Sequence, residues 1–231
     1  MDTVPYAFCC SIASVLWEFP NIDSYQLIPT NFRVWAAAFA EYQTKRVQLN
    51  VRIDFDNTEW SYSINNGFQE LAFEEFLQLP KKYVQIRDIK LGYQLFYETN
   101  PYMLPSGQVD AFFTCIKRLT NACHMDLAPY FDSSSILSYL GDVQFHSIFA
   151  SASTPDREAF LMRQMSSNSL KQFSLDSTPF DHWSEEFINA VEEYLQKPHC
   201  TDATIDGLKM KNKSLKDILD APSNKTIPGQ W

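Results

Sequence analysis

The stretch that decides the fold is residues 143–206, which read VQFHSIFASASTPDREAFLMRQMSSNSLKQFSLDSTPFDHWSEEFINAVEEYLQKPHCTDATID. Three segments in it carry apolar residues at their first, fourth and sixth positions, as expected for strands with a buried face: Phe145/Ile148/Ala150, Leu170/Phe173/Leu175 and Cys200/Ala203/Ile205. Helices are predicted between them over residues 155–165 and 185–196, the second with Ser184 as its N-cap. The stretch therefore predicts strand, helix, strand, helix, strand.

Two earlier segments, residues 83–91 and 122–127, carry a related apolar pattern at Ile86/Ile89/Leu91 and Ala122/Met125/Leu127. The spacing from one segment to the next, roughly 25 residues, overlaps that of leucine-rich repeats, in which each unit is a short strand plus a helix. Helix-connected parallel strands also obey the rules for crossover connections. We therefore predict an α/β fold in which helix–strand repeats form a short, irregular leucine-rich-repeat-like solenoid.

A different α/β fold also fits the same segments. Leucines are few, no Asn follows the candidate strands, and the spacing between the strands is irregular. An ordinary α/β sandwich with a mixed sheet is therefore the alternative.

The N-terminal part of the chain changes from a helical to a strand pattern. An apolar helix is predicted within residues 1–19, and a second helix over residues 31–42 with Asn31 as N-cap. Residues 47–55 and 60–64 alternate between apolar and polar, which predicts a hairpin around a turn at residues 56–59. We expect a helical segment over 1–45, an α/β repeat-like body over 46–221, and a mobile tail over 222–231.

The remaining elements are predicted from weaker patterns. Short helices are expected over residues 68–78, 136–140 and 215–219, and a longer one over 109–119 with Ser106 as its cap. Residues 92–106 are aromatic and irregular, with no strand or helix period.

Composition and charge narrow the class of protein. The 231 residues are 45% hydrophobic, which is typical of a folded chain, and the net charge of −9 argues against a nucleic-acid partner. No apolar run reaches the roughly 20 residues of a membrane span, and the N-terminus lacks a signal-peptide pattern. The five cysteines are odd in number and two are adjacent, which suggests free thiols. We expect a cytoplasmic or nuclear protein that is not secreted and has no membrane partner.

Sequence motifs for catalysis or cofactor binding are missing. The chain has no H-E-x-x-H, no G-x-S-x-G, no Cys-x-x-Cys and no glycine-rich phosphate loop. Asp181/His182 and Asp54/Asp56 are the two pairs that could support a hydrolase or bind a metal. The first pair fits a helix start better, and the second fits the polar face and turn of a hairpin. We expect no enzyme, no cofactor and no metal site, with a hydrolase as the remote alternative.

Several motifs resemble the large nematode-expanded family of F-box-associated proteins. The similar stretches are the N-terminal MDTVPYAFC, the hairpin segments IDFDN and WSY, and the block from NSLKQF through Trp183, Phe187 and Leu195. The resemblance covers most of the chain, although its motifs are apolar patterns rather than chemical signatures.

This resemblance implies a role in protein interaction. In that family an N-terminal F-box, when present, docks a Skp1-type adaptor of a ubiquitin ligase, and the C-terminal region is thought to present substrate. Pro5, Phe8, Ile12 and Leu16 fit the F-box pattern, whereas Val4 stands where Leu is usual and the part beyond Pro20 departs from the pattern.

Two non-enzymatic functions follow from these observations. The first is a protein-interaction module that acts as substrate adaptor of a Skp1-type ubiquitin ligase. The second is a stand-alone binding domain whose N-terminal helix is structural. An exposed aromatic patch over residues 93–102 would favour binding in either case.

Overall fold

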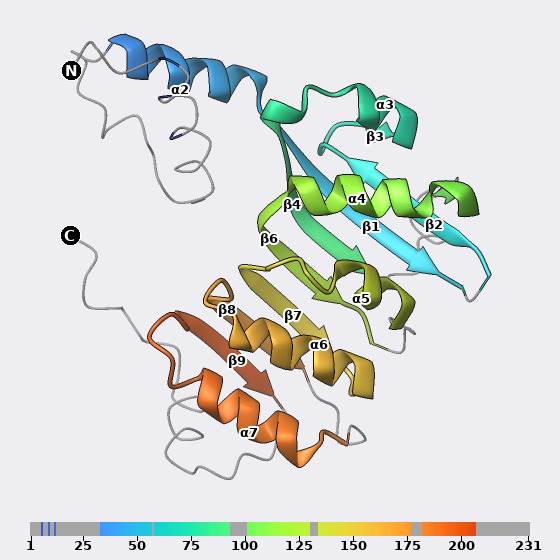
Figure 1. Cartoon of the computed structure of the whole chain (residues 1–231), viewed down its shortest axis with the longest axis vertical. Helices are drawn as coiled ribbons and strands as arrows, with labels where there is room; N and C mark the ends of the chain where they lie inside the picture. Colours follow the sequence, from blue (N-terminus) through green and yellow to red (C-terminus); the bar gives the residue numbers. More distant parts are fainter. Residues whose placement is uncertain are drawn as a thin grey trace.

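The computed structural model describes residues 33–56, 58–92, 101–129, 134–176 and 182–206, together with the single positions Tyr6, Cys9 and Ile12. These residues form an α/β structure built on one open sheet of nine strands (Figure 1). The strands are β1 (Val47–Phe55), β2 (Trp60–Asn65), β3 (Glu70–Leu71), β4 (Val84–Leu91), β5 (Tyr102–Leu104), β6 (Thr120–Leu127), β7 (Ser147–Ser151), β8 (Gln172–Asp176) and β9 (Asp202–Asp206). The helices are α2 (Arg33–Lys45), α3 (Phe73–Gln78), α4 (Val109–Leu119), α5 (Ser134–Leu140), α6 (Pro155–Ser166) and α7 (Glu185–Tyr194), with 3₁₀ turns η2 (Lys81–Tyr83) and η4 (Ser106–Gln108).

Six of the strands are parallel and lie side by side in chain order: β1, β4, β6, β7, β8 and β9. Because every crossover advances the sheet in the same direction and such crossovers are right-handed, the connecting helices are expected on one face. Figure 1 shows α4, α5, α6 and α7 in front of the strands, in agreement with this rule. Strand β2 pairs antiparallel with β1, and the short strands β3 and β5 pair with β2.

The apolar positions that predicted the strands lie in register across the sheet. The fourth positions of the pattern form one line of neighbours, Ile89, Met125, Ile148, Phe173 and Ala203. The sixth positions form a second line, Leu91, Leu127, Ala150, Leu175 and Ile205. The predicted alternation of strand and helix is therefore confirmed, and the apolar side of each strand packs under the helices.

The core beneath α4 is rich in aromatic rings. Phe112 and Phe113 are both buried, and they meet edge to face with 5.6 Å between ring centroids. Phe113 stacks on Tyr139 of α5 with centroids 4.4 Å apart, and Trp60 of β2 packs against Phe113 at 5.3 Å. These contacts join the hairpin at one edge of the sheet to helices that follow it by about 50 residues or more, so they hold the fold together across sequence distance.

Two of the predicted N-terminal caps can be compared with the structure. Ser184 caps α7, because its Oγ accepts the Phe187 N–H at 3.1 Å. The prediction for Ser106 was wrong: this residue lies in η4, and α4 begins after Gln108 without a side-chain cap. A polar residue that precedes apolar residues at helical spacing can lie in a 3₁₀ turn as well as at a helix cap, and the sequence pattern is the same in both cases.

The segment predicted as one helix over residues 68–78 is divided. Glu70–Leu71 forms β3, and only Phe73–Gln78 is helical, with the Glu75 side chain accepting the Ala72 N–H. Strand β5 lies in the stretch that showed no period. Both strands are two or three residues long, too short to produce a readable alternation.

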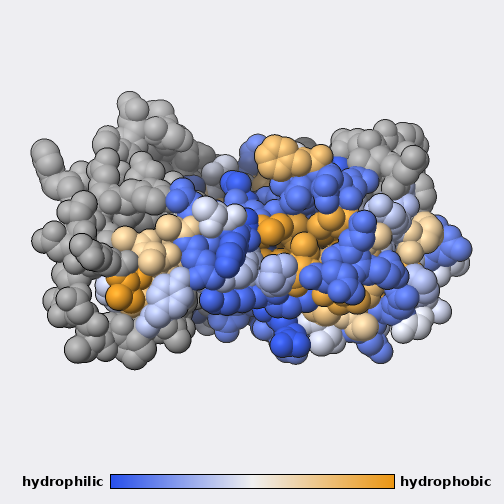
Figure 2. Space-filling view, turned by 90° about the horizontal axis from the view of Figure 1, so that it is seen from above, coloured by the Kyte–Doolittle hydropathy of each residue, from blue (hydrophilic) through white to orange (hydrophobic). Residues whose placement is uncertain are grey.

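The end of the molecule that carries α2 and α3 shows hydrophobic residues surrounded mostly by hydrophilic ones (Figure 2). Among the described residues, Leu77 of α3 is 41% exposed, and Phe68, in the turn before β3, is 99% exposed. None of the helices in the described part of the chain is long and apolar enough to cross a membrane. The expected helix at 215–219 and tail at 222–231 lie outside the described residues.

Candidate binding face of the sheet

The sheet face opposite the helices carries two continuous rows of mainly polar side chains. Residues in register on neighbouring strands point to the same face, so each row follows from the strand pairing. The first, called the His124 row, runs through Asn65, Asn50, Asp88, His124, Ser147, Gln172 and Asp202. The second, called the Asp126 row, runs through Ser63, Arg52, Lys90, Asp126, Phe149, Ser174 and Thr204.

The two ends of this face differ in exposure. On β1 and β2, Asp54, Ser61 and Ser63 are 8%, 2% and 1% exposed, so these polar side chains are closed off from solvent. Ser63 Oγ donates to a Glu70 carboxylate oxygen at 3.0 Å, so the buried Ser63 hydroxyl has a hydrogen-bond partner. On β8 and β9, by contrast, the outward residues are half-exposed or exposed. The later strands, β8 and β9 above all, therefore build the more accessible part of the face.

An open pocket of about 350 Å³ lies on the accessible part, lined by residues of β6, β7, β8 and β9. Its outward side chains alternate between large and small: Phe149, His124 and Gln172 stand next to Ser147 and Ser174. Because the serines are short, they leave a hollow beside the Phe149 ring. The pocket therefore arises from residue size on an otherwise regular sheet.

Charge is distributed unevenly along the face. Strands β6, β7, β8 and β9 contain no Lys or Arg, and their outward side chains include the carboxylates of Asp126, Asp176, Asp202 and Asp206. Strands β1 and β4 contribute Arg52 and Lys90 to the same face. The pocket thus lies on the acidic side of a face whose other side carries both signs of charge, with Asp54 and Asp88 beside Arg52 and Lys90.

One pair of side chains in the pocket could in principle do chemistry. His124 Nδ1 lies 2.9 Å from Ser147 Oγ, a distance typical of a base and a nucleophile. Asp88 is the neighbour of His124 in the His124 row. Its Oδ2 lies 3.9 Å from Arg87 Nε, and among the described contacts no hydrogen bond joins Asp88 to His124. Backbone N–H groups of central strands are used by the sheet and are not available as donors for an oxyanion.

The two pairs considered in the sequence, Asp54/Asp56 and Asp181/His182, make hydrogen bonds where they fall within the described residues. Asp56 Oδ1 accepts the N–H groups of Thr58 and Glu59 at 3.1 and 2.9 Å, and these bonds lower the pKa of Asp56. Asp54 lies on β1, with a carboxylate oxygen accepting the Phe55 N–H at 2.9 Å. Of the second pair, His182 is exposed and its carbonyl accepts from Ser153 Oγ, whereas Asp181 lies outside the described residues. Within the described part of the chain, no group of three or more His, Cys, Asp or Glu could hold a metal ion.

Of the four residues predicted to bind an adaptor, Pro5, Phe8 and Leu16 lie outside the described residues. Ile12 is helical and half-buried. Between them, Cys9 is fully buried in a cluster with Ala38 of α2, against which Val34 and Trp35 also pack. At least part of the N-terminal helical segment therefore packs on α2.

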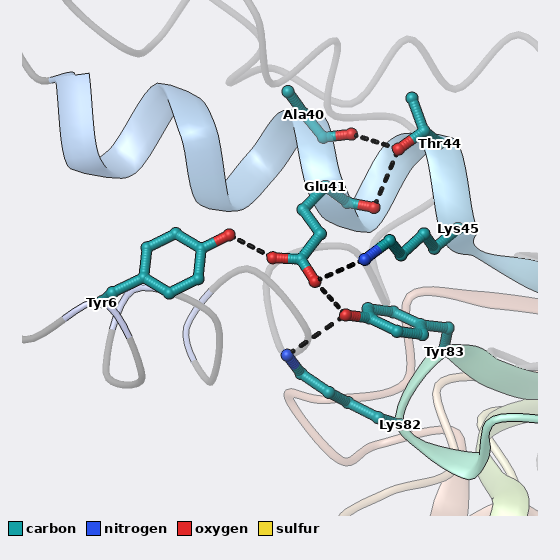
Figure 3. A network of polar contacts seen from close by, with 7 residues as sticks. All are labelled: Tyr6, Ala40, Glu41, Thr44, Lys45, Lys82 and Tyr83. Carbon is teal, nitrogen blue, oxygen red and sulfur yellow. Dashed lines mark hydrogen bonds and ion pairs between the residues drawn. The ribbon is translucent and has the colours of Figure 1, made fainter.

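A network around Glu41 joins the same segment to the sheet (Figure 3). The Glu41 carboxylate accepts hydrogen bonds from the hydroxyl groups of Tyr6 and Tyr83, and Lys45 Nζ lies 3.0 Å from it. These three donors, the Tyr6 hydroxyl first, lower the pKa of Glu41 to about 2. The carboxylate thus links the N-terminal segment, helix α2 and the turn η2 that leads into β4.

Helix α2 has a second contact, through Tyr42, with the 3₁₀ turn η2 that precedes β4. Its hydroxyl donates to the Lys82 carbonyl at 2.6 Å, and its ring meets Tyr83 edge to face at 5.3 Å. Phe39 and Tyr42, which lie three residues apart on the helix, are both buried. The helix itself runs from Arg33 to Lys45, three residues beyond the predicted end, and the expected cap Asn31 lies outside the described residues.

The expected aromatic patch over residues 93–102 can be assessed only at its end. Tyr102 is 37% exposed and stacks on Tyr62 with 5.6 Å between centroids, while residues 93–100 lie outside the described residues. Sequence reasoning did not find the His124 and Asp126 rows. The available signal was the set of polar residues alternating with the apolar ones in each predicted strand.

A scan of protein families, a search of characterised proteins and a search of solved structures each finds no match to this chain.

Proposed function

We propose that this protein is a non-enzymatic protein-interaction module whose partner binds on the polar face of strands β6 to β9. The observation that carries the proposal is the pair of polar rows, continuous across the parallel strands, with a pocket over Phe149 on the face opposite the helices. Such a face is wide, polar and preformed, which are properties that suit recognition of a protein surface.

The strand order supports the more detailed form of the fold, a short and irregular leucine-rich-repeat-like solenoid. Parallel strands that follow one another in chain order, each connected through a helix on one face, leave the opposite face of the sheet available. Repeat proteins use a surface of this kind to bind partners. The body would then span residues 46–221, as predicted from the sequence.

For the N-terminal segment, two functions are proposed. The first is the substrate-adaptor role, in which Pro5, Phe8, Ile12 and Leu16 dock a Skp1-type adaptor of a ubiquitin ligase inside the cytoplasm or nucleus. The second is a stand-alone binding domain. The burial of Cys9 against Ala38 and the Glu41 network favour the second, because a segment that packs on its own domain has less apolar surface left for an adaptor.

Co-purification with a Skp1-type adaptor tests the first role. The wild-type chain is compared with a Phe8→Asp/Leu16→Asp variant, and folding of both is followed by circular dichroism. Stoichiometric binding that the folded variant loses would support the adaptor role. If the wild type does not bind and the variant unfolds, the segment is structural and the stand-alone domain is the function to pursue.

The binding face is tested by substitutions that add bulk and charge without touching the core. Gln172 and Thr204 are exposed on β8 and β9, so Gln172→Arg/Thr204→Arg should leave the fold intact and block the face. A matched control places two arginines on the helical side, at the exposed neutral positions Ala159 of α6 and Asn189 of α7. In proximity labelling in cells, partners lost with the first variant and kept with the second would support the proposal. Identical partner sets for both variants would refute it.

A further inference from the structure

The pocket on the polar face has the chemistry to recognise one kind of side chain. Its centre is Phe149, a half-buried aromatic ring on β7 with Asp126 on one side and Ser174 on the other in the same row. An aromatic ring in a pocket that also contains an exposed carboxylate attracts a cation, which can stack on the ring and pair with that carboxylate.

The surroundings of the ring provide further acceptors. Ser147 lies two residues before Phe149 on the same strand, and Gln172 is its neighbour in the His124 row. Asp202, at the end of that row, is exposed and lines the same pocket. A planar guanidinium presents five N–H donors in a fixed fork, so it can use a carboxylate, hydroxyl groups and an amide oxygen at once.

Charge excludes the opposite kind of ligand. The strands that line the pocket have carboxylates and no Lys or Arg, and the whole chain carries a net charge of −9. A phosphopeptide or an anionic membrane would therefore be repelled from this part of the face. A basic segment would be attracted over distance and held at the pocket.

We infer that the pocket over Phe149 binds an arginine side chain of a partner protein, with the guanidinium stacked on the Phe149 ring and paired with Asp202. This inference rests on the proposed function, since it names what the binding face recognises. The partner is thus a segment of protein that presents an arginine side chain to this part of the face.

The test begins with a phage-displayed library of random 12-residue peptides selected against the full chain. Selected peptides are synthesised, and their dissociation constants are measured by fluorescence anisotropy with three variants. Phe149→Leu keeps an apolar side chain but removes the π face, Asp202→Asn removes one charge, and Gln172→Arg/Thr204→Arg blocks the face. Glu193→Gln, an exposed charge removed from α7, is the control for Asp202→Asn.

The expected result is a set of peptides with an enriched arginine. Phe149→Leu and Asp202→Asn should each weaken their binding about tenfold, the size of one stacking or charge-assisted contact, while Glu193→Gln should change it less than twofold. Replacing the peptide arginine by citrulline, which keeps the shape without the charge, should weaken binding by a similar factor. Melting temperatures of the variants confirm that they remain folded.

Two other results are distinguishable. If the blocking variant abolishes binding, but the selected peptides contain no arginine or Phe149→Leu and Asp202→Asn have no effect on their binding, the arginine pocket is refuted and the binding face stands. If selected peptides bind all variants equally, neither the pocket nor the face is the binding site, and both proposals fail.

Discussion

Replacing Ser184 by Ala should destabilise the protein more than loss of a helix cap alone. Ser184 Oγ accepts the Phe187 N–H at 3.1 Å, and such caps contribute about 1 kcal/mol. The same hydroxyl donates to the carboxylate of Glu158, which is 8% exposed and also accepts the Ser184 N–H at 3.1 Å. A hydrogen bond to a charged group contributes about 1.5–3 kcal/mol, and the lower value applies because Ser184 is on the surface and water can replace part of it.

The expected loss in the free energy of unfolding for Ser184→Ala is therefore about 2.5 kcal/mol, or a fall in Tm of about 5–10 °C for a chain of this size. Urea unfolding followed by circular dichroism measures it. Thr154→Ala is the matched control, since Thr154 caps α6 by accepting the Arg157 N–H at 3.4 Å and should cost about 0.5–1 kcal/mol.

A double substitution separates the two contributions. In a Glu158→Gln background, the charge-assisted bond is already weakened, so Ser184→Ala should cost only about 1 kcal/mol for the lost cap. If Ser184→Ala and Thr154→Ala cost the same in the wild-type background, the contact that links the starts of α6 and α7 through Glu158 does not contribute to stability, and the reasoning is wrong.

Three further substitutions test other parts of the fold. Gly67 has φ of +87° in the turn before β3, so Gly67→Ala should cost about 1 kcal/mol in urea unfolding, whereas Gly107→Ala, where space is open and φ is not positive, should stay within about 0.5 kcal/mol. Glu41→Gln should lower Tm at pH 7. Because the Glu41 pKa is about 2 rather than its ordinary 4.5, the difference in Tm between wild type and variant should shrink as the pH falls from 4.5 toward 2. A difference in Tm that stays constant over that range would contradict the stabilising role of the Glu41 network. Tyr194→Phe removes the donor to the Leu170 carbonyl at 3.3 Å and should cost about 1 kcal/mol in the same unfolding assay; an unchanged midpoint would show that this buried bond contributes nothing.

The elements that could be predicted from sequence are those with a long, clear period. The hairpin of β1 and β2 is confirmed because nine and six residues alternate without interruption. Helix α7 is confirmed with its cap because Ser184 precedes an apolar stripe that ends in buried Val191 and Tyr194. In each case the apolar residues that repeat in the sequence are the ones on the face of the element that packs against the core.

The elements that were predicted wrongly or missed also have a physical explanation. Strands β3 and β5 have two and three residues and are held by pairing with β2, so their own sequence contains little information about them. Ser106 precedes an apolar period as a cap would, yet the chain forms a 3₁₀ turn there and α4 starts at Val109. Contacts from elsewhere in the chain outweighed these weak local preferences.

Local periodicity was enough to indicate an α/β chain in which helices alternate with strands, because burial of one side of each element leaves its mark on every second or every third to fourth residue. It could not indicate which polar residues become neighbours. His124 and Ser147 are 23 positions apart, and they meet only because β6 and β7 pair in one particular register. Likewise, Ser61 and Ser63 look like solvent-facing residues of a hairpin but are buried, whereas Gln172 and Thr204 are exposed. Strand order and register are properties of the whole chain, so only the tertiary structure could place Phe149 between Asp126 and Ser174 and form the pocket.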